Sequence, residues 1–308
     1  MMSYNILQFF LPFTAYPYKG EAVPCPACGH ADSKPLVSLD RRLKRLPTSM
    51  CGHCGLLYTN PMPTDAELAT YYQDYYRFDY QAATTEPKER HLRKRRTEAA
   101  KRAKQMAELL GTGARTLDFG CGSGEFVGAM LSAGRDAHGF EPGDTYGNYA
   151  KSLYGERITV AGWQDVKFDA PFDLVTCFHV VEHLRDPVAA MQQMAQWTVP
   201  GGLVYIEIPD LGIVHPNKGF GALHFAHLTG FNQHNLVVAA ARAGLKPERI
   251  IDPTGIVFRR EEMSAEAIEE EARHGRDLAE KLYGDGRMVS NYLRYQFGKL
   301  TGTSRPKK

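Results

Sequence analysis

Residues 115–260 alternate between short apolar runs and longer amphipathic runs, which is the pattern of strands alternating with helices. Strands are predicted in ARTLDFG, DAHGFEP, RITV, FDLVTCFHV and LVYIEIPD, with two late strands in KPERIID and GIVFRR. Helices are predicted in EFVGAMLSAG, TYGNYAKSLYG, DPVAAMQQMAQWTVPGG and NQHNLVVAAARAGL. This order predicts an α/β fold with a mostly parallel sheet, whose ligand lies at the carboxyl ends of the strands.

Helical patterns also precede this sheet. Thr64 and Glu67 form a capping box that predicts the start of a short helix. Five tyrosines and one phenylalanine follow in residues 71–80, and Tyr75 and Tyr76 are candidates for a lid over a polar small molecule. The alternative is that this aromatic stretch packs between domains. Residues 88–110 predict a long helix with nine Lys or Arg, which either contacts a phosphate-rich partner or is a solvated face.

The glycine pattern is most distinctive after the first predicted strand, in LDFGCGSGEFV. Glycines in such a turn let the backbone approach a ligand, and the following helix adds free N–H groups. Dinucleotide-binding enzymes share this kind of turn, but Asp118 stands where they usually place a small apolar residue. An acid at this position favours a cationic or amino-acid ligand end. A second acid, Glu141, ends the next strand and can accept hydrogen bonds from both hydroxyls of a ribose.

Four of the six cysteines form two Cys-x-x-Cys pairs, Cys25 with Cys28 and Cys51 with Cys54. This arrangement is typical of a zinc ribbon, in which four thiolates complete a closed, structural Zn²⁺ site. The adjacent His30 and His53 could replace a cysteine ligand or bond to a sulfur. The strands of the ribbon are expected in LVSLDRRLKRLPTSM, between the pairs. The remaining cysteines, Cys121 and Cys177, have the apolar neighbours of ordinary core residues.

Composition narrows the choice of partners. The 308 residues are 43% hydrophobic, and 35 acidic side chains nearly balance 37 basic ones, which argues against nucleic acid. No apolar run approaches the roughly 18 residues of a membrane span. The opening MMSYNILQFFLPF lacks the basic region of a signal peptide, so a cytoplasmic location is expected.

Several motifs, in their order along the chain, resemble class I S-adenosylmethionine-dependent methyltransferases over about residues 90–255. They are LDFGCGSGEF, GFEPG, FDLVTCFHVVEHL and PGGLVYIEIPD. The resemblance implies a Rossmann-like seven-stranded sheet ending in a reversed hairpin, with S-adenosylmethionine as cofactor. The residues that it implies at the cofactor are Asp118, Gly120, Cys121, Gly122, Glu141, Pro142, Trp163, Gln164, Phe178 and His179.

A four-cysteine domain, then a tyrosine-rich stretch, then this core resembles bacterial sugar methyltransferases. Members that methylate carbon carry a tyrosine–histidine–glutamate–histidine run after strand five, where this chain has His224, Phe225, Ala226 and His227. A hydroxyl acceptor must lose its proton during methyl transfer, and a neutral histidine near pH 7 suits that role. The candidate bases are His227, then His224 or His179, and the candidate substrate contacts are Tyr75, Tyr76, His183 and Phe225.

These patterns predict a zinc-binding domain in residues 1–62, a linker or lid in 63–110, a methyltransferase domain in 111–260 and a helical tail in 261–308. The predicted reaction is methylation, at oxygen or carbon, of a small polar acceptor such as a sugar, nucleotide-linked sugar or polysaccharide precursor. The alternatives are an RNA methyltransferase and a non-catalytic cofactor-binding module that regulates a partner. The tail helix could also form a homodimer.

Overall fold

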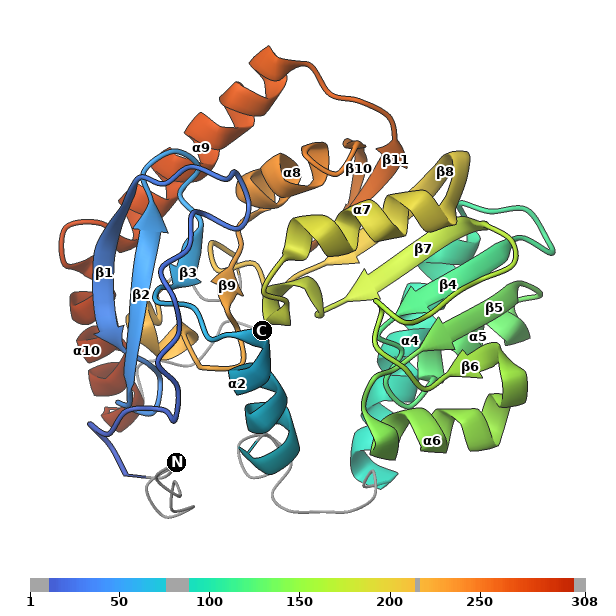
Figure 1. Cartoon of the computed structure of the whole chain (residues 1–308), viewed down its shortest axis with the longest axis horizontal. Helices are drawn as coiled ribbons and strands as arrows, with labels where there is room; N and C mark the ends of the chain where they lie inside the picture. The colour runs from blue at the N-terminus through green and yellow to red at the C-terminus, as the bar shows by residue number, and fades with distance from the viewer. Residues whose placement is uncertain (1–10, 76–88, 214–216, 302–308) are drawn as a thin grey trace.

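The computed structural model describes residues 11–75, 89–213 and 217–301, and its main element is a seven-stranded sheet (Figure 1). The strand order is β10-β11-β8-β7-β4-β5-β6. The strands are β4 (Arg115–Phe119), β5 (Asp136–Phe140), β6 (Ile158–Thr159), β7 (Phe172–Phe178), β8 (Thr198–Glu207), β10 (Leu245–Asp252) and β11 (Gly255–Arg260). Neighbours from β6 to β8 are parallel, whereas β11 is antiparallel to both β8 and β10. The predicted seven-stranded sheet with a reversed hairpin is therefore confirmed.

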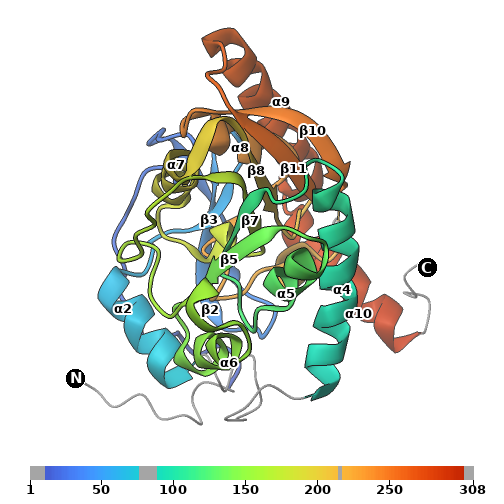
Figure 2. The ribbon, with the colours of Figure 1, turned by 90° about the vertical axis from the view of Figure 1, so that its right-hand side faces the viewer.

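Helices cover both faces of this sheet, because successive residues of its buried strands face opposite sides. One face packs on α4 (Glu89–Ala107), α5 (Glu125–Ser132) and α6 (Asp144–Tyr154), through residues that include Leu174 and Leu203. The other face packs on α7 (Pro187–Trp197) and α8 (Gln233–Ala241), through residues that include Val175 and Val204 (Figure 2).

The start of α7 is as predicted, but its end is not. Asp186 caps the helix by accepting a hydrogen bond from the N–H of Ala189, and Pro187 is its first residue. The helix ends at Trp197, so TVPGG belongs to β8 and not to the helix. The β-branched Thr198 and Val199 favour a strand, and Pro200 has no N–H to continue a helix.

A second, four-stranded sheet lies beside the first. Its order is β1 (Ser33–Leu39), β2 (Arg45–Cys51), β3 (Leu57–Thr59) and β9 (Thr229–Gly230), with all neighbours antiparallel. The strands expected between the cysteine pairs are β1 and β2. Strand β9 comes from the segment after β8, so a strand from the methyltransferase part of the chain completes the four-stranded sheet (Figure 1).

The carboxyl-terminal segment is two helices, α9 (Ala265–Tyr283) and α10 (Arg287–Leu300), where the sequence predicted one. Helix α9 packs tightly on the cysteine turns, since a Cβ added at Gly275 would lie 2.7 Å from the carbonyl oxygen of Cys54. Cys51 and Cys54 share one buried core with Leu236 of α8. Tyr58 of β3 and Ala272 of α9 belong to the same core, so the cysteine turns, the four-stranded sheet and α9 share a core with the seven-stranded sheet.

The segment between the two sheets begins with α2 (Asp65–Thr70), which carries the predicted capping box of Thr64 and Glu67. A single π-helical turn, Tyr71–Tyr75, continues it. Tyr76, one of the two predicted lid residues, lies outside the described residues. Among the described residues, no helix combines the length and the apolar character needed to cross a membrane.

Candidate active site

The glycine turn between β4 and α5 has the geometry that the sequence predicts. Gly120, Gly122 and Gly124 all have positive φ, at 75°, 55° and 82°. A Cβ on Gly120 would lie 2.8 Å from Cγ2 of Val180, which is closer than real Cβ contacts. The turn therefore depends on glycine both for its backbone conformation and for its approach to the loop after β7.

Two carboxyl groups lie at the ends of the neighbouring strands β4 and β5. Asp118 is buried and accepts a hydrogen bond from Oγ1 of Thr176 at 2.9 Å. Burial raises the pKa of Asp118 to about 7. Glu141 accepts two backbone hydrogen bonds, from Gly122 at 3.0 Å and from Gly143 at 2.9 Å. These two amides hold the Glu141 carboxylate against the glycine turn, although burial raises its pKa.

The other predicted cofactor residues differ in how far their side chains are exposed. Cys121 is buried, Trp163 is half-buried, and Pro142 and Gln164 are exposed. Phe178 packs against the same core as Cys121, with its ring centroid 4.8 Å from that of Phe126 and 4.5 Å from the guanidinium carbon of Arg102.

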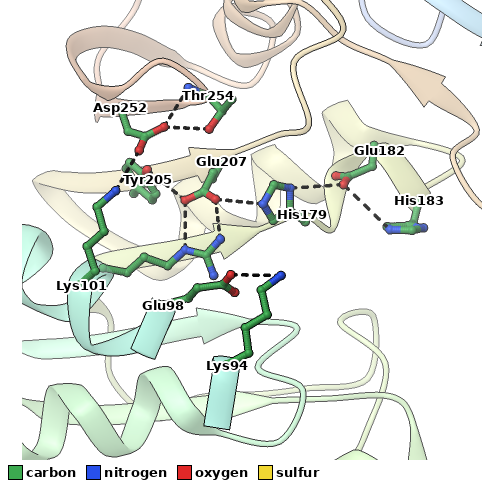
Figure 3. A network of polar contacts seen from close by, with 11 residues as sticks. Lys94, Glu98, Lys101, His179, Glu182, His183, Tyr205, Glu207, Asp252 and Thr254 are labelled. Carbon is green, nitrogen blue, oxygen red and sulfur yellow. Dashed lines mark hydrogen bonds and ion pairs between the residues drawn. The ribbon is translucent and has the colours of Figure 1, made fainter. Parts of the chain in front are cut away.

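His179 follows β7 directly and is held between two acids. Its φ is +56°, a left-handed conformation that costs on the order of 1 kcal/mol or more for a non-glycine residue. Nε2 lies 2.9 Å from Oε1 of Glu207, and Nδ1 lies 3.8 Å from Oε1 of Glu182 (Figure 3). Burial works against protonation, but these two carboxylates raise the pKa of His179. The strained backbone thus places this ring where β7 and β8 end.

Glu207 is also bound by α4. Nε of Arg102 donates to Oε2 of Glu207 at 3.1 Å, and Nη2 donates to Oε1. Burial alone would raise the pKa of Glu207, but His179 and Arg102 outweigh it and lower the pKa to about 2. Sequence reasoning did not identify Arg102 or Glu207. The spacing along the helix could have pointed to Arg102. Arg95 and Arg102 are seven residues apart and lie on the same helix face as Ala99, which is buried.

The structure brings together the remaining predicted histidines. The ring centroids of His183 and His227 are 4.6 Å apart, and those of His224 and His227 are 3.8 Å apart. Burial lowers the pKa of His183 to about 4 and also lowers that of His227. His183 comes from a 3₁₀ turn, Val181–His183, whereas the other two come from the loop after β8. Three imidazoles, two of them with lowered pKa values, thus lie together at the carboxyl ends of β7 and β8.

Phe225 lies beside these histidines in sequence but packs on the aromatic segment near the amino terminus. It is 1% exposed, stacks on Tyr16 at 4.5 Å and meets Tyr71 edge-on at 4.6 Å. Tyr75 is partly buried against the same cluster. These contacts favour the packing alternative for Tyr75 and give Phe225 a packing role as well, and a contact with substrate stays a prediction for both.

The four cysteines of the two pairs converge as a metal site requires. Their Sγ atoms all lie within 4.8 Å of one another, with Cys25–Cys54 at 3.6 Å and Cys28–Cys51 at 3.5 Å. Four thiolates bonded to Zn²⁺ at about 2.3 Å fit such separations. His30 and His53 stack on each other at 3.7 Å, and His53 pairs with Glu269 of α9 at 3.1 Å.

The strand order, the glycine turn and the acids at the ends of β4 and β5 define a class I methyltransferase fold. A family model for a methyltransferase domain matches residues 91–250, slightly more than half of the 308 residues. The chain belongs to this methyltransferase domain family, which confirms the predicted resemblance.

Similar proteins with curated names include ubiquinone biosynthesis O-methyltransferases. The protein from Psychrobacter arcticus is 33% identical over 107 residues, which cover 32% of this chain and 41% of that protein. The protein from Methylococcus capsulatus is 31% identical over 101 residues, covering 30% and 42%. The matched part thus spans about two fifths of the length of these relatives. Among solved structures, a sugar N-methyltransferase from Streptoalloteichus is 18% identical with a TM-score of 0.44, covering 53% of this chain and 87% of that chain.

Proposed function

We propose that this chain transfers a methyl group from S-adenosylmethionine to a hydroxyl of a small polar acceptor, a sugar or nucleotide-linked sugar. The observation that carries the proposal is the placement of two chemically different groups at one edge of the sheet. The glycine turn with Asp118 and Glu141 lies at the ends of β4 and β5, and the histidine cluster lies at the ends of β7 and β8.

The residues at the glycine turn fit this cofactor. Glu141 is already aligned by the N–H groups of Gly122 and Gly143, so its outer lone pairs can accept hydrogen bonds from a ribose diol. Asp118 is buried beside the turn, where the ammonium of an amino acid would favour its ionised form. When bound, S-adenosylmethionine supplies an activated methyl group. The cluster of Cys25, Cys28, Cys51 and Cys54 would hold a structural Zn²⁺ at a separate site.

A hydroxyl acceptor must lose its proton, and the histidine cluster can assist that step. His227 is neutral at pH 7 because burial lowers its pKa, so a ring nitrogen is available to bind a proton or a cation. His224 and His179 are the further candidates. The carbon-methylating run of the sugar enzymes has a glutamate where this chain has Ala226, and the curated relatives carry the name O-methyltransferase. Both observations support oxygen as the acceptor atom.

The basic helix supports a small acceptor over RNA. Arg102 pairs with Glu207, and Lys101 lies 3.6 Å from Asp252, so these cations are bound to acids of the same chain. A regulatory module is less well supported, because the tail helix α9 that would contact a partner packs on the cysteine turns. A homodimer and a cytoplasmic location stay predictions.

The experiment combines cofactor binding with acceptor screening. Calorimetric titration should show S-adenosylmethionine binding to the wild type, and Glu141→Gln should weaken it by about 10- to 100-fold, the loss of one charged hydrogen-bonding pair. Glu156→Gln, an exposed acid after α6, is the matched control. Labelled methyl transfer to hydroxylated sugars and nucleotide-sugars should then identify the acceptor.

Two outcomes would contradict the proposal. One is equal cofactor affinity in wild type and Glu141→Gln. The other is methylation of RNA with an affinity that falls steeply with salt, since phosphate contacts produce that dependence.

A further inference from the structure

Three potential metal ligands meet outside the cysteine cluster. Donor atoms of Glu182, His183 and His227 all lie within 4.8 Å of one another. We propose that these three side chains bind a divalent cation such as Zn²⁺, with open coordination positions for oxygen atoms of the methyl acceptor. The proposal rests on the proposed function for the identity of that last ligand, but not for the cation site itself.

Glu182 provides the strongest argument. Its side chain is 1% exposed, and neither carboxylate oxygen has a hydrogen-bond partner within the described part of the chain. The nearest imidazole nitrogens are 3.8 Å away in His179 and 3.9 Å away in His183, beyond hydrogen-bond distance (Figure 3). A buried carboxylate without donors is costly, and a bound cation removes that cost.

His183 is oriented as a metal ligand. Its Nδ1 lies 2.8 Å from the carbonyl oxygen of Ala226, and a carbonyl only accepts, so Nδ1 carries the hydrogen. The lone pair of the neutral ring is therefore on Nε2, which lies 3.9 Å from Oε1 of Glu182. Two acceptors thus face each other. Metal-binding histidines are commonly fixed by this kind of backbone contact at the other nitrogen.

His227 completes the set from the other side. It follows Ala226 directly, so one short segment both orients His183 and supplies the third ligand. Two imidazoles and one carboxylate form a ligand set that binds divalent transition metals and leaves positions open. Ligands bonded to Zn²⁺ at about 2.0–2.2 Å are separated by roughly 3.3–3.5 Å in a tetrahedron. The separations between the donor atoms would therefore shorten by at most about 1.5 Å on metal binding.

A cation at this place would change the role of His227 from free base to ligand. An acceptor hydroxyl bound to the cation has a lowered pKa and releases its proton to solvent. The resulting oxygen forms the new bond to the methyl carbon while the carbon–sulfur bond breaks, and the electron pair of that bond stays on sulfur.

The chain contains a matched control cluster. His234, Glu271 and His274 also lie within 4.8 Å of one another, between α8 and α9. Here, however, Nδ1 of His234 pairs with Glu271 at 2.7 Å, and His274 is exposed. This carboxylate already has its partner, so removing His274 should not change metal content.

The experiment is metal counting on the full chain, by mass spectrometry after equilibration with Zn²⁺ and removal of free ion. Wild type and His274→Ala should each hold two ions per chain, whereas Glu182→Gln and His227→Gln should hold only the thiolate-bound one. Titration with Co²⁺ separates the sites, because only the cysteine site gives thiolate charge-transfer bands. We expect more than about 100-fold weaker Co²⁺ binding at the second site in either variant, since changing even an outer contact costs 10- to 100-fold.

One ion per wild-type chain, or two ions in Glu182→Gln, would overturn the inference. A variant that keeps the cysteine-bound ion and the thermal unfolding transition is folded. If Glu182→Gln does not fold, His227→Gln still tests the inference. S-adenosylmethionine binding and methyl transfer are measured separately in EDTA. Methyl transfer at an unchanged rate in EDTA would defeat the contact between the cation and the acceptor and leave the proposed function standing. A second bound ion without S-adenosylmethionine binding would support the cation site and contradict the proposed function.

Discussion

Replacing Arg102 with Met should destabilise the fold by about 2–3 kcal/mol at pH 7. The substitution leaves Glu207 buried without the guanidinium that donates to both of its oxygens. The side chains are only 23% and 11% exposed, so solvent screens this pair weakly. Breaking a buried pair by removing one partner typically costs about 3–5 kcal/mol. We expect a cost at or just below the lower limit of that range because His179 still contacts Glu207.

The pKa of Glu207 gives a second measure of the same contact. Folding lowers this pKa from 4.5 to about 2, which corresponds to about 3 kcal/mol shared by Arg102 and His179. Because the folded-state pKa is the lower one, this stability is fully present above about pH 4.5 and is lost as the pH falls through 2. The difference in unfolding free energy between wild type and Arg102→Met should therefore be constant from neutral pH down to 4.5 and shrink below it.

Urea unfolding, followed by circular dichroism at several pH values, measures that difference. Lys94→Met is the control, because Lys94 and Glu98 form an exposed pair at 3.6 Å on the same helix. Its loss should cost at most about 0.5 kcal/mol. In the double variant with Glu207→Gln, the cost should fall below the sum of the single ones. A cost for Arg102→Met no larger than the control, or one that grows toward pH 3, would refute the reasoning.

The other predictions concern the glycines and the cysteine site. Gly275→Ala should destabilise by about 1–3 kcal/mol by overpacking, despite the better helix propensity of alanine, whereas Gly111→Ala, with open space around it, should change little in the same urea assay. Gly120→Ala should abolish measurable S-adenosylmethionine binding by calorimetry, because the strained Cβ would displace Val180 and the turn. Mass spectrometry should show that Cys51→Ser loses the thiolate-bound zinc. Because α9 packs on this site, proteolysis of the last two helices should also increase. Helices that stay intact would contradict the shared core.

Elements with local signals were predictable from the sequence. The buried strands, the capping box at Thr64 and the cysteine turns each depend on neighbouring residues, and all are present as expected. Strand β9 was not predictable, because two residues have no periodicity and their pairing partner, β3, lies far away in sequence. The apolar residues of α10 do have helical spacing. The Gly-Asp-Gly sequence before it interrupts the helical pattern, so a second helix was not predicted.

The candidate site also contains some residues whose placement could be predicted from the sequence and others whose placement could not. Asp118 and Glu141 follow strands whose position the pattern fixes, so their meeting at one edge could be expected. The contact of His183 with Ala226 depends on the path of the loop after β8, and nothing in its local sequence specifies that path. The Arg102–Glu207 pair joins residues 105 apart, and only the packing of α4 on the sheet brings them together.

The late strand β9 of the four-stranded sheet has a consequence for synthesis on the ribosome. The first sixty residues leave the exit tunnel early, but the fourth strand of their sheet is Thr229–Gly230 and the helix over their cysteine turns begins at Ala265. The sheet of β1, β2 and β3 therefore lacks its fourth strand until most of the protein has been translated. Nascent chains arrested before β9 should expose that unfinished edge to chaperones and proteases, and release of the full-length chain should protect it.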